Sequence, residues 1–434
     1  MEFPPTPTLV ELATEILREA TALQAELDKH SLPHPAFSPS GRRNYHDILF
    51  NPPALAARAK LLDASLTLHR LALGPADTLR TITNVDRTAV NVLRTLHELA
   101  IPTAVPLASS ISIPDLAAKV SAHPVPLRRL LRFAYTMHLF QEPPNQPDHV
   151  AHTPLSAEIP AYGPYLWLQL GQLTQLESAS HHFAWAVRNW PACPLSKADP
   201  KGRDMWTILH EDDPEERGMA RFADAMKAAM VGMHGESNRH FVVSFDWAAL
   251  GEGVVVDVGG GNGHNIVPVA QEFPGLRFVV QELEKNRGPF GELMRRVGLG
   301  EERVKFERHD FFGEQPGAVG FEGEVRAYVL SRVLHDWSDE KCVEIVRRLV
   351  PGMKRGARLF VVERVLPSRP REIPGYQEAQ LRAMDLLMYA SVPGGCERSM
   401  DDWETLFREV DPGLEIRSVK ALPGSEMSAI EVSF

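Results

Sequence analysis

Apolar residues recur at helical spacing through the first hundred residues of the chain. Segment 8–29 carries leucine, isoleucine and alanine at every third or fourth position, which predicts an amphipathic helix that needs a partner surface. Segments 54–74 and 87–100 repeat this pattern with leucine and valine. We therefore expect the beginning of the chain to be entirely helical.

A compact unit with a different pattern follows these helices. Segment 113–120 has proline near its start, and an arginine-bearing segment, 127–133, follows it after a turn, so both predict short helices. Two short apolar segments on either side of the polar tip 143–148 predict a hairpin. Together these elements have the outline of a winged helix-turn-helix, which could bind DNA or serve as a scaffold for dimerisation.

From about residue 252 the pattern changes to short β-branched runs that alternate with helical segments. This alternation predicts an α/β fold, with a parallel sheet covered by helices on both faces. The final segments, 414–419 and 428–433, predict a strand pair that closes one edge. We divide the chain into an N-terminal helical and winged-helix domain (1–160), a helical linker and substrate-pocket segment (161–250), and an α/β domain (251–434).

One predicted strand is followed by a glycine-rich turn of the kind that binds a nucleotide-like ligand. Residues 254–263 read Val-Val-Val-Asp-Val-Gly-Gly-Gly-Asn-Gly, so the backbone after a buried strand can approach a ligand closely. A dinucleotide fingerprint needs a further glycine where His264 stands. The remaining pattern, Asp-x-Gly-x-Gly-x-Gly, is associated with S-adenosylmethionine (SAM) sites rather than NAD sites.

An acidic residue follows the next predicted strand. Glu282 comes just after the apolar run 276–280, where it could accept hydrogen bonds from both ribose hydroxyls of an adenosine group. Dinucleotide folds use the same device, so Glu282 supports an adenosine cofactor more than SAM in particular. After a third predicted strand, 304–307, Asp310 and Phe311 could flank an adenine ring.

A histidine lies in the loop after the fourth predicted strand. His335 precedes Ser338, behind which acidic residues and an apolar run indicate the start of a helix. The loop therefore lies at the carboxyl end of the sheet, where ligands bind in folds of this class. Histidine, with an ordinary pKa of about 6.5, suits a general base, although a loop histidine can also be a structural hydrogen-bonder.

Two acidic residues favour the catalytic interpretation of this histidine. Glu363 ends the fifth predicted strand, and Glu397 lies in a glycine turn before a helix around Trp403. A carboxylate on the Nδ1–H of an imidazole fixes the tautomer and favours the cation that forms when the base takes a proton. Either acid alone could be a solvated loop residue, but the placement of all three at sheet ends favours a shared site.

The ordered motifs of the chain resemble those of a known family. Asp-Val-Gly-Gly-Gly-x-Gly, His-Asp-Trp-Ser-Asp-Glu, Glu-x-x-Leu-Pro and Pro-Gly-Gly-x-Glu-Arg are similar to motifs of the metal-independent O-methyltransferases of plant caffeic-acid type. More narrowly, they resemble the relatives of these enzymes in fungal secondary metabolism. The resemblance covers residues 90–434 and implies a Rossmann-like SAM-dependent methyltransferase domain, with N-terminal helices that form a homodimer.

The resemblance also implies roles for individual residues. His335 would deprotonate a substrate hydroxyl, while Glu363 and Glu397 flank and orient it. SAM, which leaves as S-adenosyl-L-homocysteine, would be bound by Asp257, Gly259, Gly261, Glu282, Asp310, Phe311 and Ser331. The acceptor would be contacted by His182, Asp336, Met384, Asp385 and Met388. Two positions depart from the plant pattern, because Ser331 and Cys396 stand where lysine is usual or common.

A phenolic hydroxyl is the acceptor that a histidine base favours. A phenol has a pKa of about 10 and is within its reach, whereas an alkyl alcohol is much harder to deprotonate. The expected reaction is methyl transfer to a small aromatic or polyketide-type secondary metabolite. We expect no metal, because the carboxylates lack ligand spacing and the mechanism does not need one.

Two other functions are compatible with the sequence. An enzyme of this fold can hold SAM without donating its methyl group, so that the positive charge assists a pericyclic or dehydrative step; the base and its acids favour transfer. The second is a winged-helix regulator that senses SAM. The net charge of −10 argues against the nucleic-acid partner that such a regulator would need.

The composition is that of a soluble globular protein long enough for two or three domains. Its three cysteines are widely separated, which favours a reducing compartment over a disulfide framework. The N-terminus lacks the pattern of a signal peptide, and no apolar run approaches the thickness of a bilayer. We therefore expect a cytoplasmic protein with no membrane partner.

Overall fold

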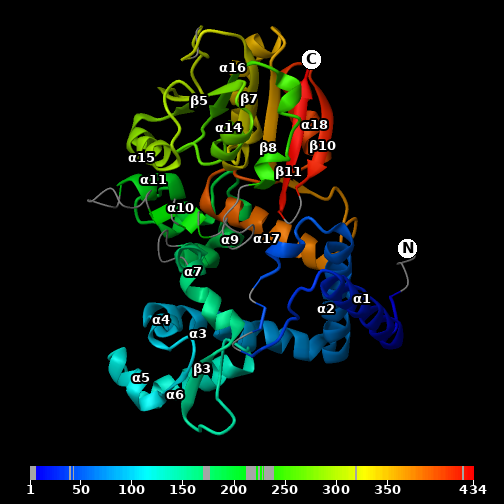
Figure 1. The fold of residues 1–434 in the computed structure, drawn as a ribbon, viewed down its shortest axis with the longest axis vertical. Helices are drawn as coiled ribbons and strands as arrows, with labels where there is room; N and C mark the ends of the chain where they lie inside the picture. The colour runs from blue at the N-terminus through cyan, green and yellow to red at the C-terminus, as the bar shows by residue number, and fades with distance from the viewer. Residues whose placement is uncertain are drawn as a thin grey trace. The chain divides into compact units, whose positions relative to one another are not determined.

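The computed structural model describes residues 6–38, 41–42, 44–169, 176–211, 221–222, 225–226, 228, 239–317, 320–422 and 425–434. The chain forms two compact units (Figure 1). The first unit comprises Met1–Thr174, Leu209–Gly232 and Pro374–Tyr376, and the second comprises Gln175–Ile208, Met233–Ile373 and Gln377–Phe434.

The first unit begins with a helical hairpin. Helix α1 (Leu9–Lys29) starts with a capping box, in which the Thr8 side chain accepts from the Glu11 backbone and Glu11 accepts in return. It packs along α2 (Pro52–Arg80), and both are blue in Figure 1. Apolar residues near the end of α1, the short η1 (His46–Ile48) and the start of α2 form the shared core.

Helix α2 is longer than the sequence pattern predicts. The predicted segment ended at Gly74, which is not helical in the structure (φ 71°), but the chain resumes its helix and continues to Arg80. A π-helical segment, η2 (Thr81–Asp86), then leads into α3 (Arg87–Glu98). The helical beginning of the chain is therefore confirmed.

The winged-helix outline is also confirmed within the first unit. Helices α5 (Ile113–Lys119) and α6 (Pro124–Thr136) lie in sequence between the strands of a small antiparallel sheet with the order β1-β3-β2. These strands are β1 (Ser110–Ser112), β2 (Phe140–Gln141) and β3 (His149–His152). Leu116, Leu131 and Phe140 are buried in one core with residues of α3 and α4 (Ile101–Ala104). Helix α7 (Pro154–Gln169) follows β3.

The second unit contains an eight-stranded sheet with the main order β10-β11-β8-β7-β4-β5-β6. The five strands from β4 to β8 are parallel, and β11 lies antiparallel between β8 and β10. The strands are β4 (Gly253–Val258), β5 (Leu276–Glu282), β6 (Val304–Arg308), β7 (Val325–Ser331), β8 (Arg358–Leu366), β9 (Arg398–Ser399), β10 (Glu415–Ala421) and β11 (Met427–Ser433). This arrangement confirms the α/β class and the strand pair that closes one edge.

Helices cover both faces of this sheet, as the alternation predicts. All six residues of β4 are buried, and successive side chains point to opposite faces. Val254 and Val256 pack into one core with α16 (Asp339–Met353) and α18 (Met400–Val410), whereas Val255 packs into a second core with α14 (Val267–Glu272) and α15 (Arg287–Val297). Burying each such side chain contributes roughly 1.5–3 kcal/mol, so the two cores fix the strands that hold the site.

Shorter elements complete the second unit. They are α8 (Leu176–Ala179), η3 (Ser180–His182), α9 (Phe183–Arg188), α10 (Pro194–Ala198), α11 (Met205–Glu211, which ends in the first unit), α13 (Arg239–Val242), η4 (Ala248–Leu250), η5 (Glu284–Asn286), η6 (Leu334–Asp336) and α17 (Gly375–Ser391, from Gln377 onward). Within the described part of the chain, every helix is too short or too polar to cross a membrane.

The structure corrects the predicted position of Glu363. This residue does not end its strand, because β8 continues to Leu366. The pairing of β8 with β7 stops at Val362, but β9 pairs with Val365 and Leu366 and extends the strand. Glu363 thus lies just beyond the part of β8 that β7 covers.

Candidate active site

The glycine turn after β4 has a backbone that only glycine adopts easily. Gly259, Gly261 and Gly263 have φ angles of 68°, 58° and 80°. A side chain at Gly259 would meet Val333 at 3.0 Å and Phe311 at 3.5 Å. A Cβ at Gly261 would meet no described atom within 4 Å, so the backbone there faces open space.

Asp257 is a buried acid beside this turn. Among the described residues, neither of its carboxylate oxygens has a hydrogen-bond partner. Burial, together with the nearby charge of Glu282, raises the pKa of Asp257 to about 7. Because an unpaired buried carboxylate is costly, its oxygens suit the hydrogen-bond donors of a polar ligand.

Glu282 at the end of β5 lies on the other side of the turn. Its Oε2 accepts a hydrogen bond from the backbone N–H of Gly261 at 3.2 Å, and its Oε1 accepts from Leu283 at 2.7 Å. Glu282 and the open backbone of Gly261, beside the buried Asp257, therefore form one polar cradle, whose carboxylate acceptors fit the ribose hydroxyls of an adenosyl group.

The remaining predicted cofactor residues differ in how they contact this turn. The Phe311 ring lies 5.9 Å from the Trp337 ring and close to Gly259. Ser331, at the end of β7, accepts a hydrogen bond from Asn265 at 3.3 Å, just after the turn. Asp310 is exposed, and its carboxylate accepts from the backbone of Phe312 at 3.0 Å.

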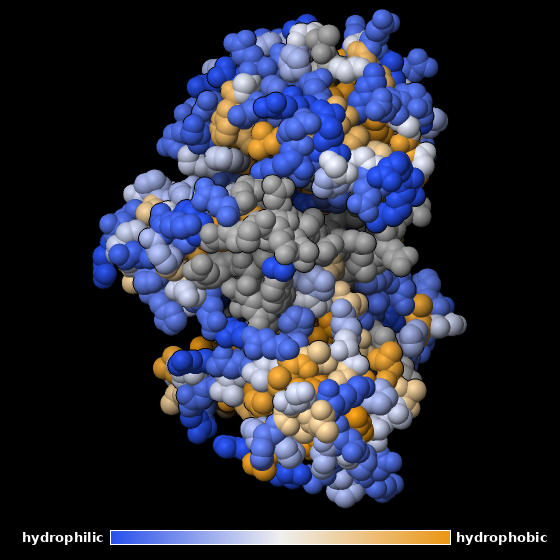
Figure 2. Space-filling model, turned by 90° about the vertical axis from the view of Figure 1, so that its left-hand side faces the viewer, coloured by the Kyte–Doolittle hydropathy of each residue, from blue (hydrophilic) through white to orange (hydrophobic). Residues whose placement is uncertain are grey.

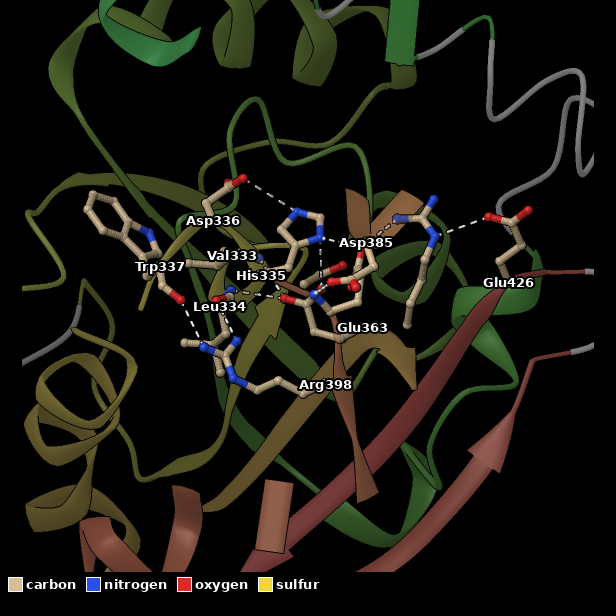
Figure 3. Close-up of polar contacts among 12 residues, drawn as sticks. Val333, Leu334, His335, Asp336, Trp337, Glu363, Asp385, Arg398 and Glu426 are labelled. Atoms are coloured by element: carbon tan, nitrogen blue, oxygen red, sulfur yellow. Dashed lines mark hydrogen bonds and ion pairs between the residues drawn. The ribbon is translucent and has the colours of Figure 1, made fainter. Parts of the chain in front are cut away.

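His335 is buried at the carboxyl end of β7, with 9% of its surface exposed. Its Nδ1 lies 3.1 Å from Oε1 of Glu397 and 3.5 Å from Oε2 of Glu363. Its Nε2 faces Asp336 at 3.7 Å, so the ring lies between acids on both sides (Figure 3). The backbone N–H of Cys396 donates to the His335 carbonyl at 3.0 Å, which ties the two loops together.

Glu363 holds the loop that carries the histidine. It is fully buried, and its Oε1 accepts hydrogen bonds from the backbone N–H groups of Val333 and Leu334, each at 2.9 Å. Burial raises the pKa of Glu363, and the two backbone donors oppose this effect. Its second oxygen has no hydrogen-bond partner in the described part of the chain and faces the imidazole.

Glu397 accepts from two cationic side chains through one oxygen. The guanidinium of Arg364 lies 3.1 Å from the same Oε1 that His335 contacts. Burial would raise the pKa of Glu397, but His335 and Arg364 outweigh it and lower the pKa. The backbone N–H of Glu397 donates to Asp385 at 2.9 Å, which brings α17 to the site.

The acids around the imidazole change its protonation. Burial would lower the pKa of His335, but Glu363, Asp336 and Glu397 outweigh burial and raise it to about 9. The neutral imidazole, which alone can accept a proton, therefore becomes more abundant as the pH rises toward 9. The buried acids also stabilise the imidazolium that forms when the ring takes a proton.

Sequence reasoning did not place two further residues in this cluster. Arg364 follows Glu363 directly on β8, and a buried arginine signals nearby acids. Trp206 on α11 donates a side-chain hydrogen bond to Asp336, whose pKa burial nevertheless raises to about 7. No local pattern could have revealed the Trp206 contact, because 130 residues separate the two partners.

The ligand atoms of His335, Glu363 and Glu397 lie within 4.8 Å of one another, a spacing that could hold a metal ion. Two features oppose this use. One oxygen of Glu363 is occupied by backbone donors, and the Arg364 guanidinium already lies against Glu397. A metal would be repelled by this fixed positive charge, so the cluster fits a protonated imidazole better.

The predicted substrate residues differ in whether they contact the His335 cluster. Met384, Asp385 and Met388 lie on α17, and Asp385 contacts the His335 cluster through the backbone of Glu397. A side chain at Gly395 would meet both the His335 and the Met388 carbonyl oxygens at 3.2 Å, so the end of α17 lies beside the base. His182 is partly exposed in η3 and takes no part in the hydrogen bonds and ion pairs described above.

Comparisons with known proteins identify relatives of this chain. A family model for an O-methyltransferase domain matches residues 191–411, and one for an O-methyltransferase dimerisation domain matches residues 88–158. The O-methyltransferase aoiF of Aspergillus oryzae is 33% identical over 394 residues, which span 88% of this chain and 89% of that protein. The grayanic acid biosynthesis cluster O-methyltransferase of Cladonia grayi is 30% identical and spans 98% of this chain and 87% of its own.

Solved structures share the fold. The structure of OxaC in complex with sinefungin and meleagrin superposes with a TM-score of 0.72 at 20% identity and covers 98% of this chain and 99% of its own. The O-methyltransferase NcsB1 from neocarzinostatin biosynthesis, in complex with SAM and 2-hydroxy-5-methyl naphthoic acid, has a TM-score of 0.62 at 25% identity. That match covers 80% of this chain and 95% of NcsB1.

Proposed function

Because this chain belongs to the O-methyltransferase family, as a SAM-dependent enzyme of secondary metabolism, we propose that it methylates a phenolic hydroxyl of a small aromatic or polyketide-type acceptor, with His335 as general base. The observation that carries this proposal is the pairing of His335 Nδ1 with Glu397 at 3.1 Å. Because Nδ1 is engaged by Glu397, Nε2 is the ring nitrogen that would take the proton of the acceptor.

The acids give the base its strength. Glu397 holds the Nδ1–H and Glu363 holds the loop, so the ring keeps one tautomer and one orientation. The pKa of His335, raised to about 9, lies close to the value of about 10 for a phenol. Proton transfer from a phenol is therefore nearly balanced, and general base catalysis of this kind contributes about 10²–10⁴-fold.

SAM, when bound, supplies a methyl group that its sulfonium charge makes electrophilic. Asp257, Glu282 and the backbone of Gly259 and Gly261 would hold it, since this cradle offers carboxylate acceptors and an open backbone. Phe311 would cover the adenine, with Asp310 and Ser331 at the edges of the same site. Correct positioning of the two reactants can contribute roughly 7–11 kcal/mol.

The acceptor would lie beside α17 and the Asp336 carboxylate. Met384, Asp385 and Met388 on α17 would line that side of the site, and we keep His182 as a further candidate. The carboxylate of Asp336, held by Trp206, would receive a hydrogen bond from a second polar group of the acceptor. The hydroxylated aromatic acid bound to NcsB1 supports an aromatic acceptor here.

We further propose a homodimer formed through the first unit. Leu71, Leu79, Ile82, Val85 and Val90 are apolar residues exposed along α2, η2 and α3. Val90 falls within the matched dimerisation domain, and Figure 2 shows that apolar residues also gather on the surface of the first unit, in the lower part of the view. The substitution Ile82→Glu should shift the mass measured by light scattering from dimer to monomer.

The proposed reaction is tested by mass spectrometry with a panel of phenols and SAM that carries a labelled methyl group. We expect one labelled methyl in the product for each S-adenosyl-L-homocysteine released. The His335→Ala variant should bind SAM almost as well but turn over about 10²-fold more slowly or worse. A product without the label would point to an enzyme that uses SAM only as a bound cation, and unchanged turnover in His335→Ala would remove the histidine from the mechanism.

A further inference from the structure

Arg364 brings a permanent positive charge into the His335 cluster. Its residue surface is only 7% exposed, although it follows Glu363 directly on β8. Its Nη1 lies 3.1 Å from Oε1 of Glu397, and its Nε lies 3.0 Å from Oε2 of Glu426. The dashed line from Glu426 in Figure 3 marks the second of these contacts.

A fixed cation and a titrating cation share one carboxylate oxygen. His335 Nδ1 and Arg364 Nη1 both lie 3.1 Å from Oε1 of Glu397, whereas Oε2 has no hydrogen-bond partner among the described residues. Because guanidinium does not lose its charge, it always engages part of the Glu397 charge. The attraction between the Glu397 carboxylate and the protonated His335 is therefore weaker than it would be without Arg364.

Charged groups approach the imidazole from several elements. Asp336 comes from its own loop, Glu363 from β8 and Glu397 from the turn before β9. Glu397 is itself contacted by Arg364 and, on α17, by Asp385. Arg398 donates to the backbone carbonyls of Leu334 and Trp337 on either side of the histidine, so it holds the loop.

We propose that Arg364 is a positioning residue that acts through Glu397 and limits how strongly His335 retains a proton, so that more of the imidazole is available as a base. The inference rests on the proposed role of His335. Arg364 touches neither reactant in this role; it sets the charge that the base feels. Glu426 opposes Arg364, because it offsets part of the guanidinium charge from the other side.

The test is the pH dependence of kcat for the full-length enzyme, measured for wild type, Arg364→Met and Arg364→Lys. Methionine removes the charge but keeps an unbranched stem, so the rising limb of the profile should move to higher pH by about one unit or more. Lysine keeps the charge, so the rising limb of Arg364→Lys should lie close to that of wild type. The KM for SAM should stay within about twofold, because Arg364 does not line the cofactor cradle.

A matched control lies on the same strand. Arg358 forms an ion pair with Glu431 at 3.0 Å, and Arg358→Met removes that pair without touching the cluster. Its pH profile should coincide with that of wild type. If Arg364→Met lowers kcat at every pH and leaves the limb in place, Arg364 is only structural and the inference is wrong.

A second variant covers the case in which Arg364→Met does not fold. Glu426→Gln leaves the guanidinium in place but removes the charge that offsets it, so the limb should move the opposite way, to lower pH. No shift, or a shift to higher pH, would overturn the inference. Full turnover in His335→Ala would instead defeat the proposed general base, so the two failures are distinguishable.

Discussion

Oε1 of Glu397 lies 3.1 Å from Nδ1 of His335, although 62 residues separate the two in the chain. The contact depends on two loops that a backbone hydrogen bond from Cys396 to the His335 carbonyl ties together. Glu363 holds the loop of His335 by accepting hydrogen bonds from the backbone N–H groups of Val333 and Leu334. The base is thus held by its side chain and by its backbone at once, which is the preorganisation that proton transfer requires.

The substitution Glu397→Gln should lower both the maximal rate and the pH at which it is reached. The carboxylate raises the pKa of His335 against the effect of burial, so its neutralisation lets that pKa fall from about 9 toward lower values. The rising limb should therefore move to lower pH, while kcat on the plateau falls about 10-fold or more because the imidazolium loses a partner. Rapid-quench assays between pH 6 and pH 10 would measure both effects. A limb that moves to higher pH would contradict the assignment.

The substitution Asp257→Asn should stabilise the enzyme while weakening SAM binding. The pKa of Asp257 is raised to about 7. The folded protein therefore loses stability as the pH rises from about 4 through 7, because the buried carboxyl group must ionise. Asparagine does not titrate, and the gain over wild type should grow across that range to the order of 2 kcal/mol at pH 8. Thermal unfolding at several pH values, without ligand, measures the gain.

The control for this prediction is Asp310→Asn, because Asp310 is exposed and its carboxylate accepts a hydrogen bond from the nearby Phe312 backbone. Its unfolding curve should follow that of wild type at every pH. If Asp257→Asn gives the same small effect at pH 4 and pH 8, the carboxylate is not destabilised by burial, and the interpretation of its unpaired oxygens fails.

Chelation should leave turnover unchanged. Arg364 lies against Oε1 of Glu397, and its permanent positive charge opposes a second cation in the cluster. We expect activity after prolonged dialysis against EDTA to remain within about twofold of the starting value, with no gain on addition of zinc or magnesium. Loss of activity that an added metal restores would assign His335, Glu363 and Glu397 to a metal site instead.

The sequence predicted the five parallel strands of the sheet because each of them carries its own signal. Buried runs such as 254–258 and 276–280 are β-branched and flanked by turns, so local pattern and tertiary role agree. His335 and Glu397 could be predicted as neighbours for the same reason, since the fold brings the carboxyl ends of parallel strands to one edge.

What the sequence could not predict comes from pairings over long distances. The extension of β8 past Glu363 depends on β9, more than thirty residues later, and has no local signal. The contact of Trp206 with Asp336 depends on how short helices pack on the site. Arg364 was missed because an arginine beside a predicted catalytic acid has the appearance of a strand-end residue, until the strand is seen to continue.

Substitution of Gly261 separates backbone strain from ligand binding at the glycine turn. Gly261→Ala places a Cβ at φ 58° with no described atom within 4 Å, so it costs about 1 kcal/mol in backbone strain without a clash. Gly298 offers a matched control at the end of α15, with φ 71° and equally open space, far in the sequence from the cradle. Both variants should lose similar stability in thermal unfolding. Only Gly261→Ala should weaken SAM binding by calorimetry, about 10-fold or more, because its methyl group enters the space that the ligand needs. Equal SAM affinities in the two variants would mean that the ligand does not lie against Gly261.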